Sequence, residues 1–155
     1  MYDLAATLER VALMAAAAVP DTKQAFAQFF RTYPNFPYWT LRLGPMQVEP
    51  EGEPYEVHTH EVVLRLVIGH LTEGYDGALE GRLPGYVTEA LAYFQARPTL
   101  QRTRADAPLL YLHPNGAAVV RASGYRAFVR LGESVQIGAE ITLSVPFHAT
   151  IERAV

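Results

Sequence analysis

The stretch VQIGAEITLSVPFHATI, residues 135–151, decides the fold because its apolar and polar residues alternate without an exception. Alternation with a period of two indicates a strand with one buried face and one polar face. At about 3.3 Å per residue the strand would be roughly 55 Å long, which exceeds the width expected for a domain of this size. We therefore expect the strand to bend at Gly138 or Pro146, or to project toward a partner that could be another subunit.

Two helices are predicted upstream of this strand. Residues 2–18 carry apolar side chains at helical spacing, and Pro20 ends the pattern. A second helix is predicted from an N-cap at Asp76 to about Arg97. Pro84 lies inside this segment, and it either kinks the helix or marks its true first turn.

Two more long strands are predicted from their alternation. Residues 55–69 form the first, and their apolar positions change parity along the way, which predicts a bulge near 58–61. Residues 118–131 form the second, with a similar change of parity at Gly124 as the expected bulge.

The segment between the first helix and these strands is rich in proline and aromatic residues. Two short strands joined by a turn at 33–37 are predicted within 23–43, and a helix over 22–31 is the competing interpretation. Long loops are predicted at about 44–54 and 98–108, because glycine and proline or charged residues dominate there.

The order of these elements predicts an α+β fold in a single domain, residues 1–155: a mostly antiparallel, twisted sheet of 4–6 strands with two main helices packed on one face. Half of the residues are apolar, which is enough for a sizeable core. The absence of cysteine excludes disulfides and thiolate chemistry. The formal charge of −3 argues against tight binding to nucleic-acid phosphates, and the apolar run at 11–19 is too short to span a bilayer.

His58 and His60 form the best candidate pair for a metal ion, because alternate residues of a strand share a face. Gly52 lies six residues before His58, as at the start of the first cupin motif, but Leu64 and Arg65 stand where that motif needs a carboxylate. We therefore predict a surface or interface pair and no metal.

No catalytic constellation is visible elsewhere in the sequence. The remaining histidines, His70, His113 and His148, have no partner at a useful spacing, and none of the serines lies in a nucleophile elbow. We therefore predict a non-enzymatic protein without a cofactor.

Two stretches carry a further pattern: VVLRLVIGHLTEGYDG at 62–77, and a run from SGY at 123–125 to GAEITLSVPF at 138–147. They resemble the tail-terminator (tail-completion) proteins of long-tailed bacteriophages. The first is similar to the central strand and the start of the core helix of that family, and the second resembles its closing hairpin. Residues 23–54 depart from the family pattern through their aromatic and proline content.

The resemblance implies a virion protein that forms a closed ring, expected to be a hexamer, and is assembled in the host cytoplasm. The ring would cap the tail tube protein and join it to a head-completion or neck protein, with DNA passing through the lumen without specific binding. Three alternatives remain: another phage neck, connector or tail-tube subunit; a small cupin-like metal-dependent enzyme that uses His58 and His60; and an α+β module that binds a small molecule.

A closed ring needs two different surfaces that meet between neighbours. The sequence offers an acidic group and a basic group that could set the register of such a contact. We predict a subunit interface between these two groups, which are Glu49, Glu51, Glu53 and Glu56 on one side and Arg97, Arg102 and Arg104 on the other.

Overall fold

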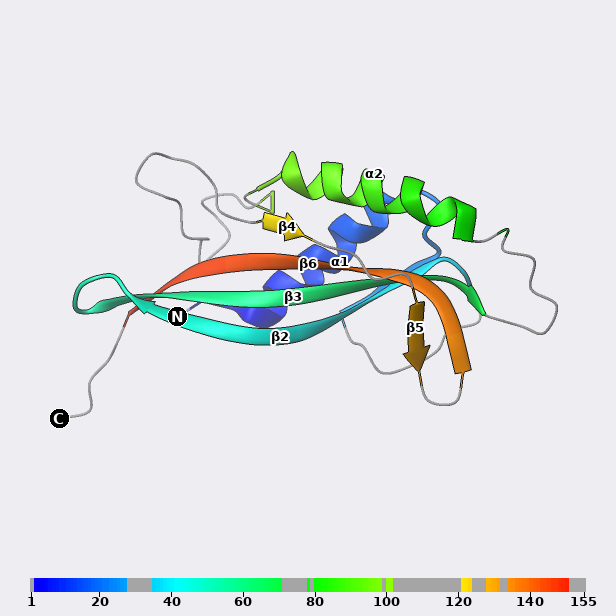
Figure 1. The fold of residues 1–155 in the computed structure, drawn as a ribbon. Coiled ribbons are helices and arrows are strands. Elements are labelled where there is room, and N and C mark those ends of the chain that lie inside the picture. Colours follow the sequence, from blue (N-terminus) through cyan, green and yellow to red (C-terminus); the bar gives the residue numbers. More distant parts are fainter. Residues whose placement is uncertain are drawn as a thin grey trace.

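The structure is a computed structural model that describes residues 2–27, 35–70, 78, 80–98, 100–101, 121–123, 128–131 and 134–150. Its described elements form the predicted α+β fold, with two helices on one face of a mostly antiparallel sheet (Figure 1). No helix in the described ranges is long and apolar enough to cross a membrane. The elements are α1 (Leu4–Ala18), β1 (Gln24–Phe26), β2 (Tyr38–Pro50), β3 (Tyr55–His70), the 3-10 helix η1 (Glu80–Arg82), α2 (Leu83–Gln95), β4 (Arg121–Ser123), β5 (Phe128–Leu131) and β6 (Ser134–Thr150).

Three long strands, β2, β3 and β6, make up most of the sheet. Its order is β1-β2-β3-β6-β4, and β5 pairs with the first part of β6. Only the pairing of β1 with β2 is parallel, and the other described pairings are antiparallel. Because β3 and β6 pair from Tyr55–Thr150 to His70–Gln136, the alternating strand identified from sequence lies inside the sheet and does not project alone.

The first helix matches its prediction closely. The Asp3 side chain caps it by accepting a hydrogen bond from the backbone N–H of Ala6 at 3.0 Å. The second helix is shorter than predicted, because it begins at Leu83 with Arg82 as N-cap and ends at Gln95. Asp76 is therefore not its cap, and Pro84 marks the first turn, where a missing N–H costs nothing.

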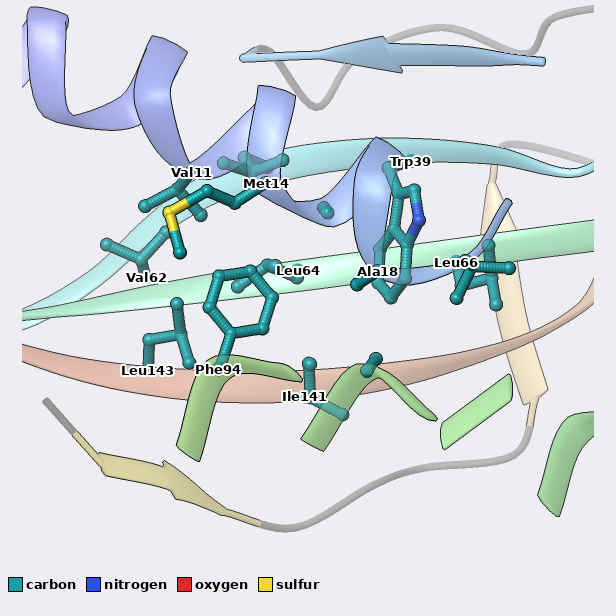
Figure 2. Packing of buried hydrophobic residues seen from close by; sticks show 14 of the residues in the cluster. Val11, Met14, Ala18, Trp39, Val62, Leu64, Leu66, Phe94, Ile141 and Leu143 are labelled. Carbon is teal, nitrogen blue, oxygen red and sulfur yellow. The ribbon is translucent and has the colours of Figure 1, made fainter. Parts of the chain in front are cut away.

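The core lies between the helices and one face of the sheet (Figure 2). The strands contribute alternate residues to it, as a half-buried sheet requires, and the helices contribute one stripe each. Phe94 of α2 and Met14 of α1 reach the same apolar layer over β3 and β6. The labelled members of this layer are Val11, Met14, Ala18, Trp39, Val62, Leu64, Leu66, Phe94, Ile141 and Leu143.

The predicted loop at 44–54 is wrong over most of its length. Strand β2 continues to Pro50, and only residues 51–54 turn the chain into β3. A register shift between Leu43 and Met46 places the bulge at Gly44 and Pro45. A bulge absorbs the glycine and the proline while the strand goes on, which the composition alone did not reveal.

The bulge predicted near 58–61 of β3 lies instead in the neighbouring strand β2, where the extra residue at Gly44 and Pro45 faces Glu61. Strand β3 keeps one register with β6 from Tyr55 to Val67, and the shift comes later, between Val67 and Gly69. The change of parity has a different cause, since Tyr55 and Val57 lie on the face opposite to the core. Both faces of β3 carry apolar side chains, so the change in the parity of its apolar residues did not require a bend in the strand.

Strand β6 bends near its start, where it curls away from the plane of β2 and β3 (Figure 1). Gly138 follows the start of β6 closely in sequence, and a Cβ atom there would clash with the backbone carbonyl oxygen of Leu66. The register between β3 and β6 shifts next to this position, and glycine permits a very close approach of β6 to β3. The expected bulge at Gly124 and the 98–108 loop beyond Gln101 lie outside the described residues.

Candidate functional site

An arm of three strands extends past α2 at the end of the sheet where β2 turns into β3 (Figure 1). We define the arm as residues 43–50 of β2, 55–62 of β3 and 143–150 of β6. Its tip is a tight turn, in which Gly52 has a φ of 93° and its carbonyl accepts a hydrogen bond from the N–H of Tyr55 at 2.8 Å. The arm carries the histidine pair and the acidic group, which the sequence analysis identified within residues 49–60.

A hydrogen-bonded chain of four side chains lies on the helix-facing side of the arm. The hydroxyl of Tyr2 is 2.9 Å from Nδ1 of His58 and 2.6 Å from Nε2 of His60. Nε2 of His58 is 2.8 Å from Oε2 of Glu56. The ring of Tyr2 also stacks on Phe147 with 4.3 Å between the ring centroids. Through these contacts Tyr2 packs the residues just before α1 against the arm.

Two arrangements of protons satisfy every bond in this chain. In the first, His58 donates from Nε2 to Glu56 and its Nδ1 accepts the proton of the Tyr2 hydroxyl, while the Tyr2 oxygen accepts the N–H of His60. In the second, both ring nitrogens of His58 donate, one to Glu56 and one to the Tyr2 oxygen, and the Tyr2 hydroxyl donates to Nε2 of a neutral His60. Protonating both histidines would leave the Tyr2 hydroxyl proton without an acceptor.

His58 and His60 lie on one face of β3 as expected, but His60 is buried and is not a surface residue. The Tyr2 hydroxyl lies between the two rings, within hydrogen-bond distance of both. In the described part of the chain, no three or more histidine or carboxylate side chains are grouped as metal ligands. A catalytic metal site needs three protein ligands and an open position. The geometry instead supports a positioning role, in which the histidines hold Tyr2.

Burial sets the protonation of this cluster. Burial lowers the pKa of His60, and the charge of a protonated His58 lowers it further. Burial also raises the pKa of the Tyr2 hydroxyl, so the group stays a hydrogen-bond donor at neutral pH. The chain is therefore most stable when His60 is neutral.

We expect the stability of the protein to fall as the pH drops below about 6.5, the ordinary pKa of histidine. Because the pKa of His60 is lowered by folding, the unfolded chain binds the proton first, and the contribution of neutral His60 is lost on acidification. Urea unfolding at pH 7.5 and 5.5 measures this difference, and His60→Asn should reduce it. His70→Asn removes an exposed histidine from the same strand and serves as the control. An unchanged pH dependence in His60→Asn would contradict the assignment.

The acidic group lies at the tip of the arm, where Glu51, Glu53 and Glu56 are engaged within the chain. Glu56 binds His58, and Glu51 lies 2.9 Å from His148 on the other face, where His148 stacks on Tyr55. Glu49, Glu51 and Glu53 are exposed, whereas Glu56 is half-buried.

The basic group is only partly described. The guanidinium of Arg97 lies 3.7 Å from the centroid of the Tyr93 ring and donates to the Tyr93 carbonyl oxygen at 3.2 Å. Arg102 and Arg104 lie outside the described residues. The interface predicted between the acidic and basic groups stays a prediction.

Sequence reasoning missed a row of exposed apolar side chains on the arm. Leu43, Met46 and Val48 of β2 are each between 44 and 49 % exposed. Because β2 was expected to be a loop here, their common face was not recognised. The apolar alternation was present in the sequence, but it is interrupted by the extra residue of the bulge at Gly44 and Pro45. Once the bulge is taken into account, Leu43 and Met46 lie on the same face of β2.

The fold and the arm together define the class: an α+β protein that presents a three-stranded arm with an exposed apolar row and an acidic tip. No protein-family model matches the chain, and no curated protein matches it.

Proposed function

We propose that this chain is a structural subunit of a long-tailed bacteriophage, a tail terminator that assembles into a closed ring on the end of the tail tube. The observation that carries the proposal is the arm, on which a row of exposed apolar side chains, Leu43, Met46 and Val48, lies near an acidic tip. Such surfaces are typical of proteins that bind other chains.

The positions of the resembling stretches support the same function. Residues 62–70 belong to β3 and residues 138–147 belong to β6, and these two strands pair with each other at the centre of the sheet. The resemblance to tail terminators therefore falls on one continuous part of the fold. The mild negative charge suits a ring through which DNA passes without being held.

The mass of the protein in solution tests the proposal. We expect light scattering after size exclusion to give about 103 kDa, six times the chain mass of 17.2 kDa, because the resemblance implies a hexamer in which head-to-tail contacts close into a ring. Negative-stain images of the same peak should show rings. A chain that stays monomeric at high concentration and also fails to bind isolated tail tubes would contradict the proposal.

Another neck, connector or tail-tube subunit is the second candidate, because the same arm would serve it. The images separate the two, since a tube subunit stacks into filaments whereas a terminator stops at a single ring. The cupin-like alternative has no comparable support, because the described His58 and His60 are both bound by Tyr2.

A further inference from the structure

Tyr2 is the point at which the residues before α1 contact the arm. Its hydroxyl lies within hydrogen-bond distance of both His58 and His60, and its ring stacks on Phe147. The next residue, Asp3, is the N-cap of α1, so no flexible linker separates Tyr2 from the first turn of the helix. A change in the contacts of Tyr2 is therefore transmitted directly to the start of α1.

The hydroxyl of Tyr2 can be held between the two histidines only while one of their ring nitrogens accepts its proton. Either histidine can be that acceptor, so one added proton on His58 leaves every hydrogen bond of the cluster in place. A second proton, on His60, removes the last acceptor and brings two cationic rings to one oxygen atom. The bound position of Tyr2 is therefore disfavoured when both histidines are protonated.

The groups that face the two histidines do little to compensate for the second proton. On β3, Glu56 binds Nε2 of His58 and so acts first on that ring. Before α1, the carboxylate of Asp3 is engaged in the helix cap. Strands β2 and β6 contribute apolar side chains opposite the histidines, which are Met46, Val48, Val145 and Phe147. The other ionisable residues on the strands of the arm lie on the opposite face, and they are Glu49, Tyr55, Glu61 and His148.

Acid favours the position in which Tyr2 is released. Burial in the closed cluster lowers the pKa of His60, and a protonated His58 lowers it further. When Tyr2 leaves, water reaches the His60 ring, and its pKa returns toward the ordinary value of about 6.5. Because the released state then binds the proton more tightly, a fall in pH below about 6.5 shifts the equilibrium toward release.

We propose that Tyr2, His58 and His60 form an acid-sensitive latch, which holds the residues before α1 on the arm at neutral pH and releases them when both histidines are protonated. Release uncovers the face of Phe147 on which the Tyr2 ring stacks. The exposed apolar row of β2 lies on this same face of the arm. The released arm therefore presents a wider apolar surface across β2, β3 and β6. This device goes beyond the proposed ring, and it can be tested on the chain alone.

Amide hydrogen exchange, followed by mass spectrometry, measures the latch where it acts. After correction for the chemical exchange rate, we expect residues 4–8 to be protected up to about tenfold less at pH 5.5 than at pH 7.5, because release takes up a proton on His60. This exchange should respond little to 1 M urea, since a local release exposes little surface. In α2 the same urea should speed exchange about fivefold or more. Equal urea sensitivity in the two helices would mean that residues 4–8 exchange only by global unfolding, and it would overturn the latch.

Two variants separate the proton from the hydroxyl. His60→Gln keeps a side-chain oxygen that can accept the Tyr2 hydroxyl but cannot be protonated in this range, so residues 4–8 should stay protected at pH 5.5. Tyr2→Phe removes the bridging atom, so these residues should already exchange faster at pH 7.5. Tyr86→Phe removes a hydroxyl that donates to Asp21 at 3.0 Å, beyond the opposite end of α1, and serves as the matched control. The latch is wrong if His60→Gln keeps the full pH dependence, or if Tyr2→Phe exchanges no faster than the control.

A fluorescent probe of apolar surface provides the second test. We expect anilinonaphthalene sulfonate to bind the natural chain more strongly at pH 5.5 than at pH 7.5, while the far-UV circular dichroism remains that of the folded protein. Tyr2→Ala removes the ring that covers Phe147, so it should bind the probe at pH 7.5 as strongly as the natural chain does at pH 5.5. Probe fluorescence that rises only when the circular dichroism signal is lost would show that no apolar surface is uncovered in the folded state.

Discussion

Replacing Gly138 with valine is expected to destabilise the protein by about 4 kcal/mol or more, which is a large part of the stability of a typical domain. A Cβ atom at this position would overlap the carbonyl oxygen of Leu66 and come within 3.3 Å of the Cα of Val67. Both contacts are with the backbone of the neighbouring strand, so no side-chain rotation can relieve them. The two strands would have to separate at this position.

Urea unfolding followed by circular dichroism measures this effect, and Gly85→Ala is the matched control. Gly85 lies in α2, and an added Cβ atom there meets nothing within 4 Å. Alanine is the better helix former, so Gly85→Ala should stabilise the protein by about 0.5–1 kcal/mol. A Gly138→Val variant as stable as the natural chain would show that β3 and β6 are not so close at this point.

The sequence predicted the parts of the fold that depend on local pattern. The alternation at 135–151 and the helical spacing at 2–18 each appear in the structure with boundaries that differ by one or two residues. Long periodic segments specify their own geometry, because one face of each must be buried. A bend at Gly138 or Pro146, or a projecting end, was expected because the strand is longer than a domain of this size is wide.

The features missed from sequence depend on residues far apart in the chain. A bulge at Gly44 and Pro45 looks like a loop in a linear sequence, and it hid the extension of β2 to Pro50. The histidine pair was recognised, but its partner Tyr2 lies more than fifty residues away and belongs to no spaced motif. Tertiary contacts of this kind become visible only when the sheet and helix are placed together.

The arm depends both on local sequence pattern and on contacts between distant residues. Its strands follow from local alternation, whereas its exposed apolar row became visible only once β2 was placed beside β3. The Tyr2 cluster covers the β6 side of the apolar face and leaves the β2 side exposed.

Replacing Glu140 with alanine should destabilise the protein by about 2–4 kcal/mol, since it removes the carboxylate bound to a buried arginine. Nε and NH2 of Arg65 lie 3.2 and 2.9 Å from Oε1 of Glu140, and Arg65 is only 7 % exposed. Burial lowers the pKa of the guanidinium, and the hydrogen bond and charge of Glu140 oppose this shift. Because the Glu140 side chain is partly exposed, the expected loss of stability is smaller than for a fully buried ion pair.

Two further variants separate charge from packing at this pair. Glu140→Gln keeps a hydrogen-bond acceptor of the same shape, which can still bind the Arg65 guanidinium. The free energy of unfolding should therefore fall less than in Glu140→Ala, by at least the contribution of one charge-assisted hydrogen bond, about 1 kcal/mol. The double variant Arg65→Leu and Glu140→Leu removes both charges, and it should recover much of the lost stability because neither ion then has to be desolvated. If the double variant is instead less stable than Glu140→Ala alone, Arg65 stabilises this face of the sheet mainly through the packing of its aliphatic stem and not through its charge.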